Sequence, residues 1–185
     1  MPPSAPGFLA FASPALAAAG IGLRAARPED LPLLAAIYGS TREEELRQVP
    51  WSAEQKKAFT DWQSAKQEEH YAVHYPNAER LLIERHPEGD SRDRVPIGRI
   101  YLETTAIEVR LMDITLLAAE RNRGVGTRVM DLLLAYVDAL QRQSSLHVEP
   151  FNPARRMYER MGYATSETRG LYEFMVRPAQ ARTTA

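Results

Sequence analysis

Arg121, Gly124 and Gly126 lie in the stretch RNRGVGT, residues 121–127, whose residue types suit the binding of an anion. Glycine adopts backbone conformations that other residues avoid and lets a ligand approach the main chain closely. A helix that starts near Thr127 would add unpaired N–H groups and a partial positive charge at its first turn. Arg121 and Arg123 would add fixed charge. The stretch predicts a cradle for a phosphate or diphosphate group, and a glycine-rich turn without a ligand is the alternative.

Two common phosphate-binding motifs do not match this stretch. No Gly-Lys-Ser/Thr ending is present, so the stretch is not a P-loop. A third glycine is also missing, and the strands expected before it are joined as a hairpin, which disagrees with the dinucleotide-binding fingerprint.

The segment before the loop, residues 106–117, has the alternating apolar pattern of a strand, but the phase of the alternation changes between Leu111 and Met112. Such a slip of one residue is typical of a β-bulge, which interrupts the ladder and leaves backbone N–H and C=O groups free for a ligand or an oxyanion. A strand buried on both faces is the alternative. The apolar positions are Ile107, Val109 and Leu111, followed by Met112, Ile114 and Leu116.

The composition is that of an ordinary globular protein. The chain has 185 residues, 44% hydrophobic and 25% charged, and a net charge of -1. This charge balance gives no reason to expect a nucleic acid or a membrane as a partner. Because the chain has no cysteine, disulfides, thiolate metal sites and a cysteine nucleophile are excluded. The cysteine count is compatible with a reducing compartment, and we expect a cytoplasmic protein without a bound metal.

Periodicity along the chain predicts one α/β domain over residues 21–178, with the element order β-α-α-β-β-β-α-β-α-β-β and a mixed sheet. Residues 1–20 are expected to be a flexible Ala/Pro-rich leader, and residues 179–185 a flexible tail. Ser52 and Gln55 predict a capping box at the start of a long helix. Residues 86–93 are expected to be a hairpin loop.

Two segments together resemble the GNAT superfamily of N-acetyltransferases. Arg121, Gly124 and Gly126 match the family's Arg/Gln-x-x-Gly-x-Gly/Ala motif, in the place where the family has it. The later segment NPARRMYERMGY, residues 152–163, matches the family's asparagine-to-tyrosine segment. The matching residues there are Asn152, Ala154, Tyr158, Gly162 and Tyr163.

The resemblance covers roughly residues 21–178. It implies a mostly antiparallel twisted sheet with helices on both faces and with strands four and five splayed apart to admit acetyl-CoA. Backbone groups of strand four would pair with the pantetheine arm, amides of the glycine loop would hold the pyrophosphate, and Asn152 would touch the cofactor arm. The cofactor-binding residues implied are Ile114, Thr115, Leu116, Arg121, Asn122, Arg123, Gly124, Val125, Gly126, Thr127 and Asn152.

The resemblance also implies that Tyr158 is catalytic and donates a proton or a hydrogen bond to the departing thiolate. A phenol with a pKa of about 10 can donate to a thiolate whose conjugate acid has a pKa of about 8.5. Without the family, Tyr158 would be interpreted as a core aromatic residue. The amine must lose a proton before it attacks, and the candidate bases are Glu108, on the predicted strand four, and Glu149. Glu108 paired with Arg110 as a structural ion pair is the alternative.

Three other features have weaker interpretations. His70 and His74 lie four residues apart on a helix but lack a third ligand, so a solvated helix end is preferred to a metal site. His147 could help to move a proton, although a packed histidine is the simpler interpretation. The segment 41–51 would line the acceptor pocket by analogy with the family. There the three residues Glu43–Glu45 favour a cationic amine, whereas Arg110 favours an acceptor that carries a carboxylate.

We therefore expect an N-acetyltransferase that moves an acetyl group from acetyl-CoA directly to the primary amine of a small molecule. Acetylation of a protein N-terminus or a lysine is the alternative within the same chemistry. A non-catalytic acyl-CoA-binding module is the alternative from another class. A homodimer is possible by analogy with the family.

Overall fold

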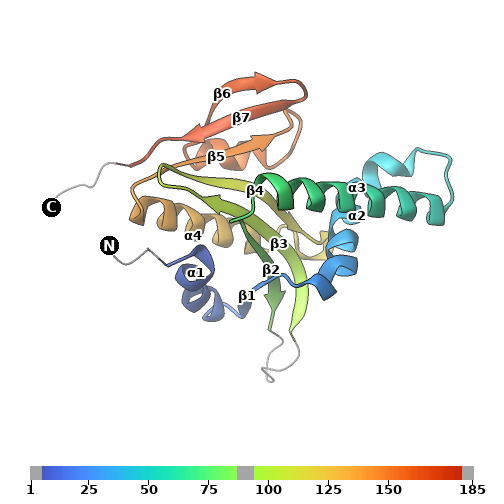
Figure 1. Ribbon diagram of the computed structural model, residues 1–185, viewed down its shortest axis with the longest axis horizontal. Coiled ribbons are helices and arrows are strands. Elements are labelled where there is room, and N and C mark those ends of the chain that lie inside the picture. Colours follow the sequence, from blue (N-terminus) through green and yellow to red (C-terminus); the bar gives the residue numbers. More distant parts are fainter. Residues whose placement is uncertain (1–5, 87–93, 181–185) are drawn as a thin grey trace.

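The computed structural model describes residues 6–86 and 94–180, and within these residues seven strands form one sheet (Figure 1). The strand order is β1-β2-β3-β4-β5-β7-β6, and every neighbouring pair is antiparallel except β4 and β5, which are parallel. The strands are β1 (Ile21–Ala25), β2 (Glu79–Arg85), β3 (Val95–Thr104), β4 (Glu108–Leu116), β5 (Gln143–Val148), β6 (Ala164–Arg169) and β7 (Tyr172–Arg177).

Helices cover both faces of the sheet, as the family resemblance implies. The helices α2 and α3 pack on one face, whereas α1 and α4 pack together on the other (Figure 1). The helices are α1 (Phe8–Ala17), α2 (Leu31–Arg47), α3 (Ala53–His74), α4 (Val125–Ala139) and α5 (Arg155–Arg160), with short 3-10 turns at Pro28–Asp30 and Ala118–Glu120. The mixed, mostly antiparallel α/β architecture is therefore confirmed, and so is the predicted order of elements from residue 21 onward.

The prediction of a flexible leader over residues 1–20 is wrong for residues 8–17, which form helix α1. Phe8, Ala12 and Leu16 recur every four residues, and all three are completely buried. The carboxylate of Glu79 accepts hydrogen bonds from the backbone N–H groups of Phe8 and Leu9, at 2.7 and 2.9 Å. These are amides that an isolated helix leaves without a partner. The domain therefore begins before residue 21. Residues 1–5 of the predicted leader and 181–185 of the predicted tail lie outside the described residues.

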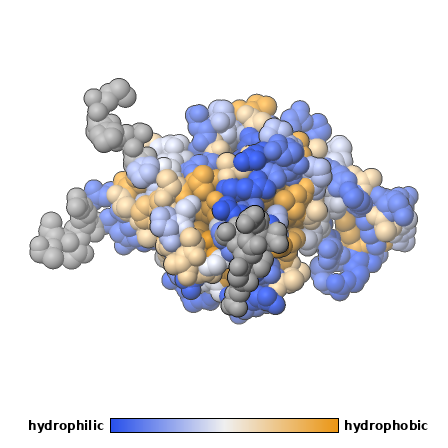
Figure 2. Space-filling model, turned by 90° about the horizontal axis from the view of Figure 1, so that it is seen from below, coloured by the Kyte–Doolittle hydropathy of each residue, from blue (hydrophilic) through white to orange (hydrophobic). Residues whose placement is uncertain are grey.

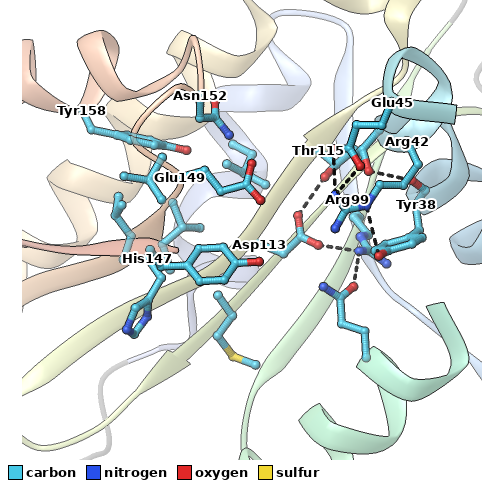
Figure 3. A pocket seen from close by; sticks show the side chains of 18 residues that line it. Tyr38, Arg42, Glu45, Arg99, Asp113, Thr115, His147, Glu149, Asn152 and Tyr158 are labelled. Carbon is cyan, nitrogen blue, oxygen red and sulfur yellow. Dashed lines mark hydrogen bonds and ion pairs between the residues drawn. The ribbon is translucent and has the colours of Figure 1, made fainter. Parts of the chain in front are cut away.

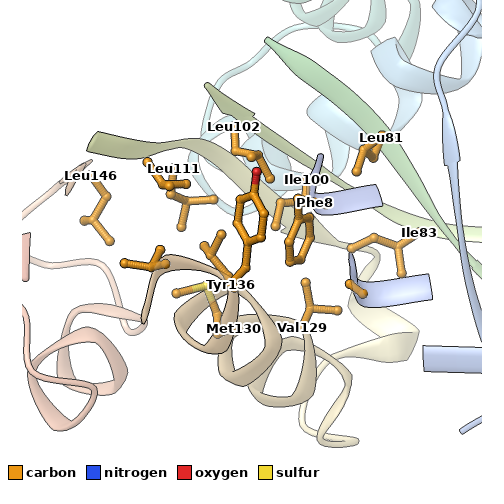
Figure 4. Close-up of a cluster of buried hydrophobic side chains, with 14 of the residues drawn as sticks. Phe8, Leu81, Ile83, Ile100, Leu102, Leu111, Val129, Met130, Tyr136 and Leu146 are labelled. Carbon is orange, nitrogen blue, oxygen red and sulfur yellow. The ribbon is translucent and has the colours of Figure 1, made fainter. Parts of the chain in front are cut away.

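The main core lies between the sheet and the helix pair α1 and α4. Phe8 packs beside Tyr136 of α4, with ring centroids 5.7 Å apart, and Val129 and Met130 lie on the same face of α4 (Figure 4). This face is the helical apolar stripe that follows the glycine loop in the sequence, and its burial against the sheet orients the start of α4.

Local sequence signals fix several ends of these elements. Ser52 caps α3 by accepting a hydrogen bond from the N–H of Gln55, and the Gln55 side chain accepts one from the N–H of Ser52. The predicted capping box is therefore confirmed. Gly162 ends the α5 segment with a φ of 90°, a left-handed conformation that glycine adopts without strain. The predicted hairpin loop at 86–93 lies, except for His86, outside the described residues.

Strand β4 contains the predicted bulge, at Met112. Tyr101 of β3 pairs with Asp113 and the next residue, Leu102, pairs with Leu111, so Met112 is the extra residue. Met112 packs against Tyr101 on the face covered by α2 and α3, and Asp113 follows it on the same face. The side chains of Leu111 and Ile114 lie on the opposite face, in the main core. The bulge therefore turns Asp113 away from the apolar core.

The parallel strands β4 and β5 pair only at one end. Their register runs from Glu108 opposite Gln143 to Leu111 opposite Leu146, and it stops where the bulge begins. The splaying of strands four and five, which the family resemblance implies, is therefore present in the structure. Beyond Leu111, the backbone groups of β4 that would face β5 are available to a ligand.

In the described part of the chain, no helix is both long and apolar enough to cross a membrane. Seen from below, hydrophilic and hydrophobic residues are interspersed over the surface (Figure 2).

Candidate active site

A cavity of about 270 Å³ opens where β4 and β5 part. Tyr158, Asn152 and Glu149 approach it from the side of β5 and α5, while Tyr38, Arg42 and Arg99 approach it from the side of α2 and β3 (Figure 3). Asp113 lies between the two groups. The cavity is lined by Tyr38, Thr41, Arg42, Glu45, Gln67, Arg99, Leu111, Met112, Asp113, Ile114, Thr115, Leu146, His147, Val148, Glu149, Asn152, Tyr158 and Tyr172.

The phenol of Tyr158 is brought to this cavity by α5. Its side chain is 6% exposed and packs edge-on against Tyr163, with ring centroids 6.0 Å apart. Burial is the main cause that raises the pKa of Tyr158 above its ordinary value, and the neighbouring Tyr163 and Asp113 raise it further. The phenol therefore keeps its proton at neutral pH and can act as a hydrogen-bond donor.

The segment before α5 is also held by a side chain. The Asn152 side-chain oxygen accepts a hydrogen bond from the N–H of Ala154 at 2.9 Å, which turns the chain into α5. Asn152 also lines the cavity, and thus both positions the helix and faces the site.

The glycine loop has the backbone shape that the sequence indicates. Asn122 and Gly124 have φ angles of 60° and 79°, and Gly124 precedes the first residue of α4. Left-handed residues at this point turn successive N–H groups to one side, which forms a concave site for an anion. The first amides of α4, from Val125 to Thr127, have no carbonyl one turn earlier to bond with. The loop therefore presents amides, and α4 adds its partial positive charge.

The loop is joined to the end of β4. Arg121 donates from Nε to the carbonyl of Leu116 at 2.9 Å, and a Cβ on Gly126 would lie 3.5 Å from Leu116 Cδ1. Arg123 lies 3.9 Å from Glu120. One carbonyl that the family resemblance assigns to the pantetheine arm is thus bonded to Arg121. Ile114 and Thr115, the other two predicted residues of β4, line the cavity.

Glu108 does not line the cavity, and its assignment as the catalytic base is a prediction that we correct. Its carboxylate accepts a hydrogen bond from Arg110 Nε at 3.1 Å and another from the hydroxyl of Ser145. Glu108 lies in the part of β4 that is still paired with β5, four residues before the bulge. The ion pair with Arg110, which the sequence left open as the alternative, is what the structure contains.

Glu149, the second candidate base, lies at the cavity. It follows β5 and is half-buried, and within the described residues its carboxylate forms neither a hydrogen bond nor an ion pair. A half-buried carboxylate with no such partner can accept a proton from a ligand.

A buried ionic network on the α2 and α3 side was missed by sequence reasoning. Arg99 is 1% exposed, and it donates to Asp113, to Gln67 at 2.7 Å and to Glu68 at 3.3 Å. Tyr101 also donates to Glu68, at 2.9 Å. The available signal was an arginine inside the apolar strand VPIGRIYL, since an arginine in a buried strand needs a partner.

Only part of the predicted acceptor region reaches the cavity. Glu45 lines it and is paired with Arg42 at 2.9 Å, and Glu43 lines a separate hollow between α2 and α3. The aromatic residues Trp51 and Trp62 pack on either side of Phe59 and do not line the cavity. His147 lines the cavity and remains exposed, with a lowered pKa.

The sequence matches the model of the acetyltransferase (GNAT) family over residues 38–163, which is more than half of the chain. Together with the parted strands and the glycine loop, this match shows that the chain belongs to the GNAT family of acetyltransferases.

Solved structures share this fold at low sequence identity. The PaiA N-acetyltransferase from Thermoplasma acidophilum, crystallised with coenzyme A, is 18% identical with a TM-score of 0.59, and the match covers 85% of this chain and 98% of that one. An acetyltransferase from Thermus thermophilus is 19% identical with a TM-score of 0.58, covering 85% and 96%. No curated protein matched the chain.

Proposed function

We propose that the protein transfers an acetyl group from acetyl-CoA to the primary amine of a small molecule. The observation that carries the proposal is that β4 and β5 stop pairing at Leu111 and Leu146, and that Tyr158 and Glu149 line the cavity which opens there. These two residues supply a proton donor and a proton acceptor in the same site.

The residues present fit two parts of coenzyme A, the pantetheine arm and the diphosphate. Ile114 and Thr115 would offer backbone groups to the pantetheine arm, and Asn152 would contact that arm. The amides from Asn122 to Thr127 would hold the diphosphate at the start of α4. When acetyl-CoA is bound, its thioester supplies an electrophilic carbonyl and a thiolate leaving group.

The side chains of the cavity would then manage two protons. Glu149 would accept the proton that the ammonium form of the acceptor must lose before its nitrogen can attack. Tyr158 would donate to the leaving sulfur, since burial keeps its phenol protonated. Because the chain has no cysteine to form an acyl intermediate by that route, we propose direct attack of the amine within a ternary complex.

The walls of the cavity support a small acceptor. Tyr38, Arg42 and Glu45 of α2 close the side opposite Tyr158, which leaves about 270 Å³. A space of this size suits a compact amine better than a folded protein surface.

The experiment is a thiol-release assay with acetyl-CoA across a panel of small amines and of peptides with free N-termini or lysines. We expect turnover with small amines and a higher melting temperature when coenzyme A is bound. Faster turnover with peptides would favour a protein acetyltransferase instead. Binding of coenzyme A without turnover on any amine would favour a non-catalytic module, and no binding at all would overturn both.

A further inference from the structure

A second hollow of about 470 Å³ adjoins the cavity on the other side of the bulge. Both hollows are lined by Gln67, Leu111, Met112, His147 and Tyr172, so they adjoin one another at Met112. The function proposed above does not involve this second hollow. The remaining residues that line it are His70, Tyr71, Tyr75 and Arg110.

Arg110 is the one arginine, lysine or carboxylate among the described residues that line the second hollow. Its position is fixed, because Nε donates to Glu108 at 3.1 Å and Nη1 donates to the hydroxyl of Tyr75 at 3.3 Å. In the described part of the chain, Nη2 has no hydrogen-bond partner. The guanidinium also lies 5.8 Å from the ring centre of Phe174.

The surroundings of Arg110 favour an anion. Glu108 offsets part of its charge, but Glu108 itself faces Ser145 and lines neither hollow. The pKa of His147, which lines both hollows, is lowered by burial first and then by Arg110 and Arg169, against the opposing effect of Glu108 and Glu167. The neighbouring arginines therefore outweigh the neighbouring carboxylates at His147.

Apart from Gln67, the remaining walls are apolar or aromatic. Tyr71 packs edge-on against Tyr75 with ring centroids 6.2 Å apart, and Met112 lies at the junction of the two hollows. Arg110 precedes Asp113 by three residues, which places the two at most on the order of 10 Å apart along the strand. A ligand with its amine in the cavity, which Asp113 and Glu149 line, could thus reach Arg110 in the second hollow through a short chain of methylene groups.

We propose that the acceptor is an amino carboxylic acid whose primary amine and carboxylate are separated by an unbranched apolar spacer, with the carboxylate bound by Arg110. This inference rests on the proposed function, because it names the substrate of that same site. The Nη2 of the Arg110 guanidinium, which is free among the described residues, can donate a charge-assisted hydrogen bond to one carboxylate.

The test compares ε-aminocaproate with hexylamine and with the methyl ester of ε-aminocaproate, by kcat/KM in the thiol-release assay. The three probes share an alkylamine, and only the first carries a negative charge. We expect the wild-type protein to prefer ε-aminocaproate by roughly tenfold or more, since a hydrogen bond to a charged group contributes about that much. Equal values for the three probes would overturn the inference without a variant being needed.

Arg110→Gln should remove this preference, so that the ratio of kcat/KM for ε-aminocaproate over hexylamine falls to about that of the ester over hexylamine. Arg169→Gln is the matched control, because Arg169 lies 5.4 Å from the same Phe174 ring, is exposed and lines neither hollow. It should keep the preference. A ratio that survives in Arg110→Gln overturns the inference.

If no amine is acetylated although coenzyme A binds, the proposed function fails and this inference fails with it. Turnover without preference for the acid overturns this inference alone.

Discussion

At the scale of single residues, Tyr158 combines burial with access to the cavity. Its raised pKa keeps the phenol protonated, and its position on α5 directs it to the space between β4 and β5. A proton donor placed at a leaving group contributes typically a factor of about a hundred or more to the rate. Tyr158→Phe removes that proton and leaves the ring.

We expect Tyr158→Phe to lower kcat by roughly a hundredfold, while the dissociation constant of coenzyme A changes less than about threefold. Thiol release and calorimetric titration measure the two quantities. Tyr163→Phe is the matched control, because Tyr163 packs against Tyr158 but bonds to Ser144 and does not line the cavity. Equal losses of kcat in both variants would show that Tyr158 has only a structural role.

Arg99 has a different kind of importance, because it neutralises buried carboxylates. Asp113 pairs with its guanidinium, Glu68 pairs both with it and with Arg80 at 3.6 Å, and Arg99 is 1% exposed. Removing one partner of a buried pair leaves an uncompensated charge, which costs about 3–5 kcal/mol. We expect Arg99→Met to lower the free energy of unfolding by about that amount in urea denaturation.

Arg42→Met is the control for this prediction. Arg42 pairs with Glu45 near the surface, where the Glu45 side chain is 60% exposed, and such pairs contribute about 0–1 kcal/mol. Similar losses in the two variants would contradict the role assigned to Arg99.

At the scale of elements, the bulge in β4 and the helix α1 show what local patterns can and cannot predict. The bulge could be predicted from the sequence, because a change of phase in the apolar alternation involves only neighbouring residues and does not depend on what packs around the strand. Helix α1 could not, because Pro14 lies inside it and because nearly every residue of FLAFASPALA is apolar, so no polar face marks a helical period. The helical spacing of Phe8, Ala12 and Leu16 indicates a helix only once α4 and the sheet are known to bury these three side chains.

Phe8→Ala tests the position of α1. Because Phe8 is completely buried against Tyr136, we expect a loss of about 3–5 kcal/mol in the free energy of unfolding. Ala15→Ser, on the exposed side of the same helix, should change it by less than about 0.5 kcal/mol. An equally small effect of Phe8→Ala, measured by denaturant titration, would contradict the packing of α1 and favour the flexible leader expected from the sequence.

At the scale of the whole molecule, one ion cluster links stability to acid pH. Arg24 joins Asp30 at 2.6 Å and Glu84 at 2.7 Å, and hydrogen bonding to Arg24 is the main cause that lowers the pKa of Asp30 from 3.8 to about 2. A carboxylate with a lowered pKa stabilises the fold above its ordinary pKa, and this contribution is lost as the pH falls toward the lowered value.

We therefore expect the wild-type protein to lose up to about 2 kcal/mol through Asp30 as the pH falls through this range. Asp30→Asn does not titrate, so its unfolding free energy should fall less steeply between pH 3.8 and about 2. Urea denaturation at the two ends of that range measures the difference. Parallel curves for the two proteins would show that Asp30 is not linked to folding.

The arrangement of the whole molecule also explains which features could be predicted from the sequence alone. The order of elements from residue 21, the cap at Ser52 and the glycine loop depend on short stretches of sequence, and the structure contains all three. The meeting of Arg99 with Glu68 and Asp113 depends on three separate elements, so no local pattern could predict it. Glu108 was placed on the correct strand, but whether it faced the cavity or Arg110 depended on how far β5 stays paired.

The aromatic stack at the beginning of α3 has a practical consequence for spectroscopy. The chain contains two tryptophans, Trp51 and Trp62, which flank Phe59 and are 42% and 58% exposed. Intrinsic tryptophan emission therefore reports on the beginning of one long helix and hardly on the sheet. An emission-monitored melting curve will coincide with a circular-dichroism curve only if that helix separates from the sheet in the same cooperative step in which the strands unfold.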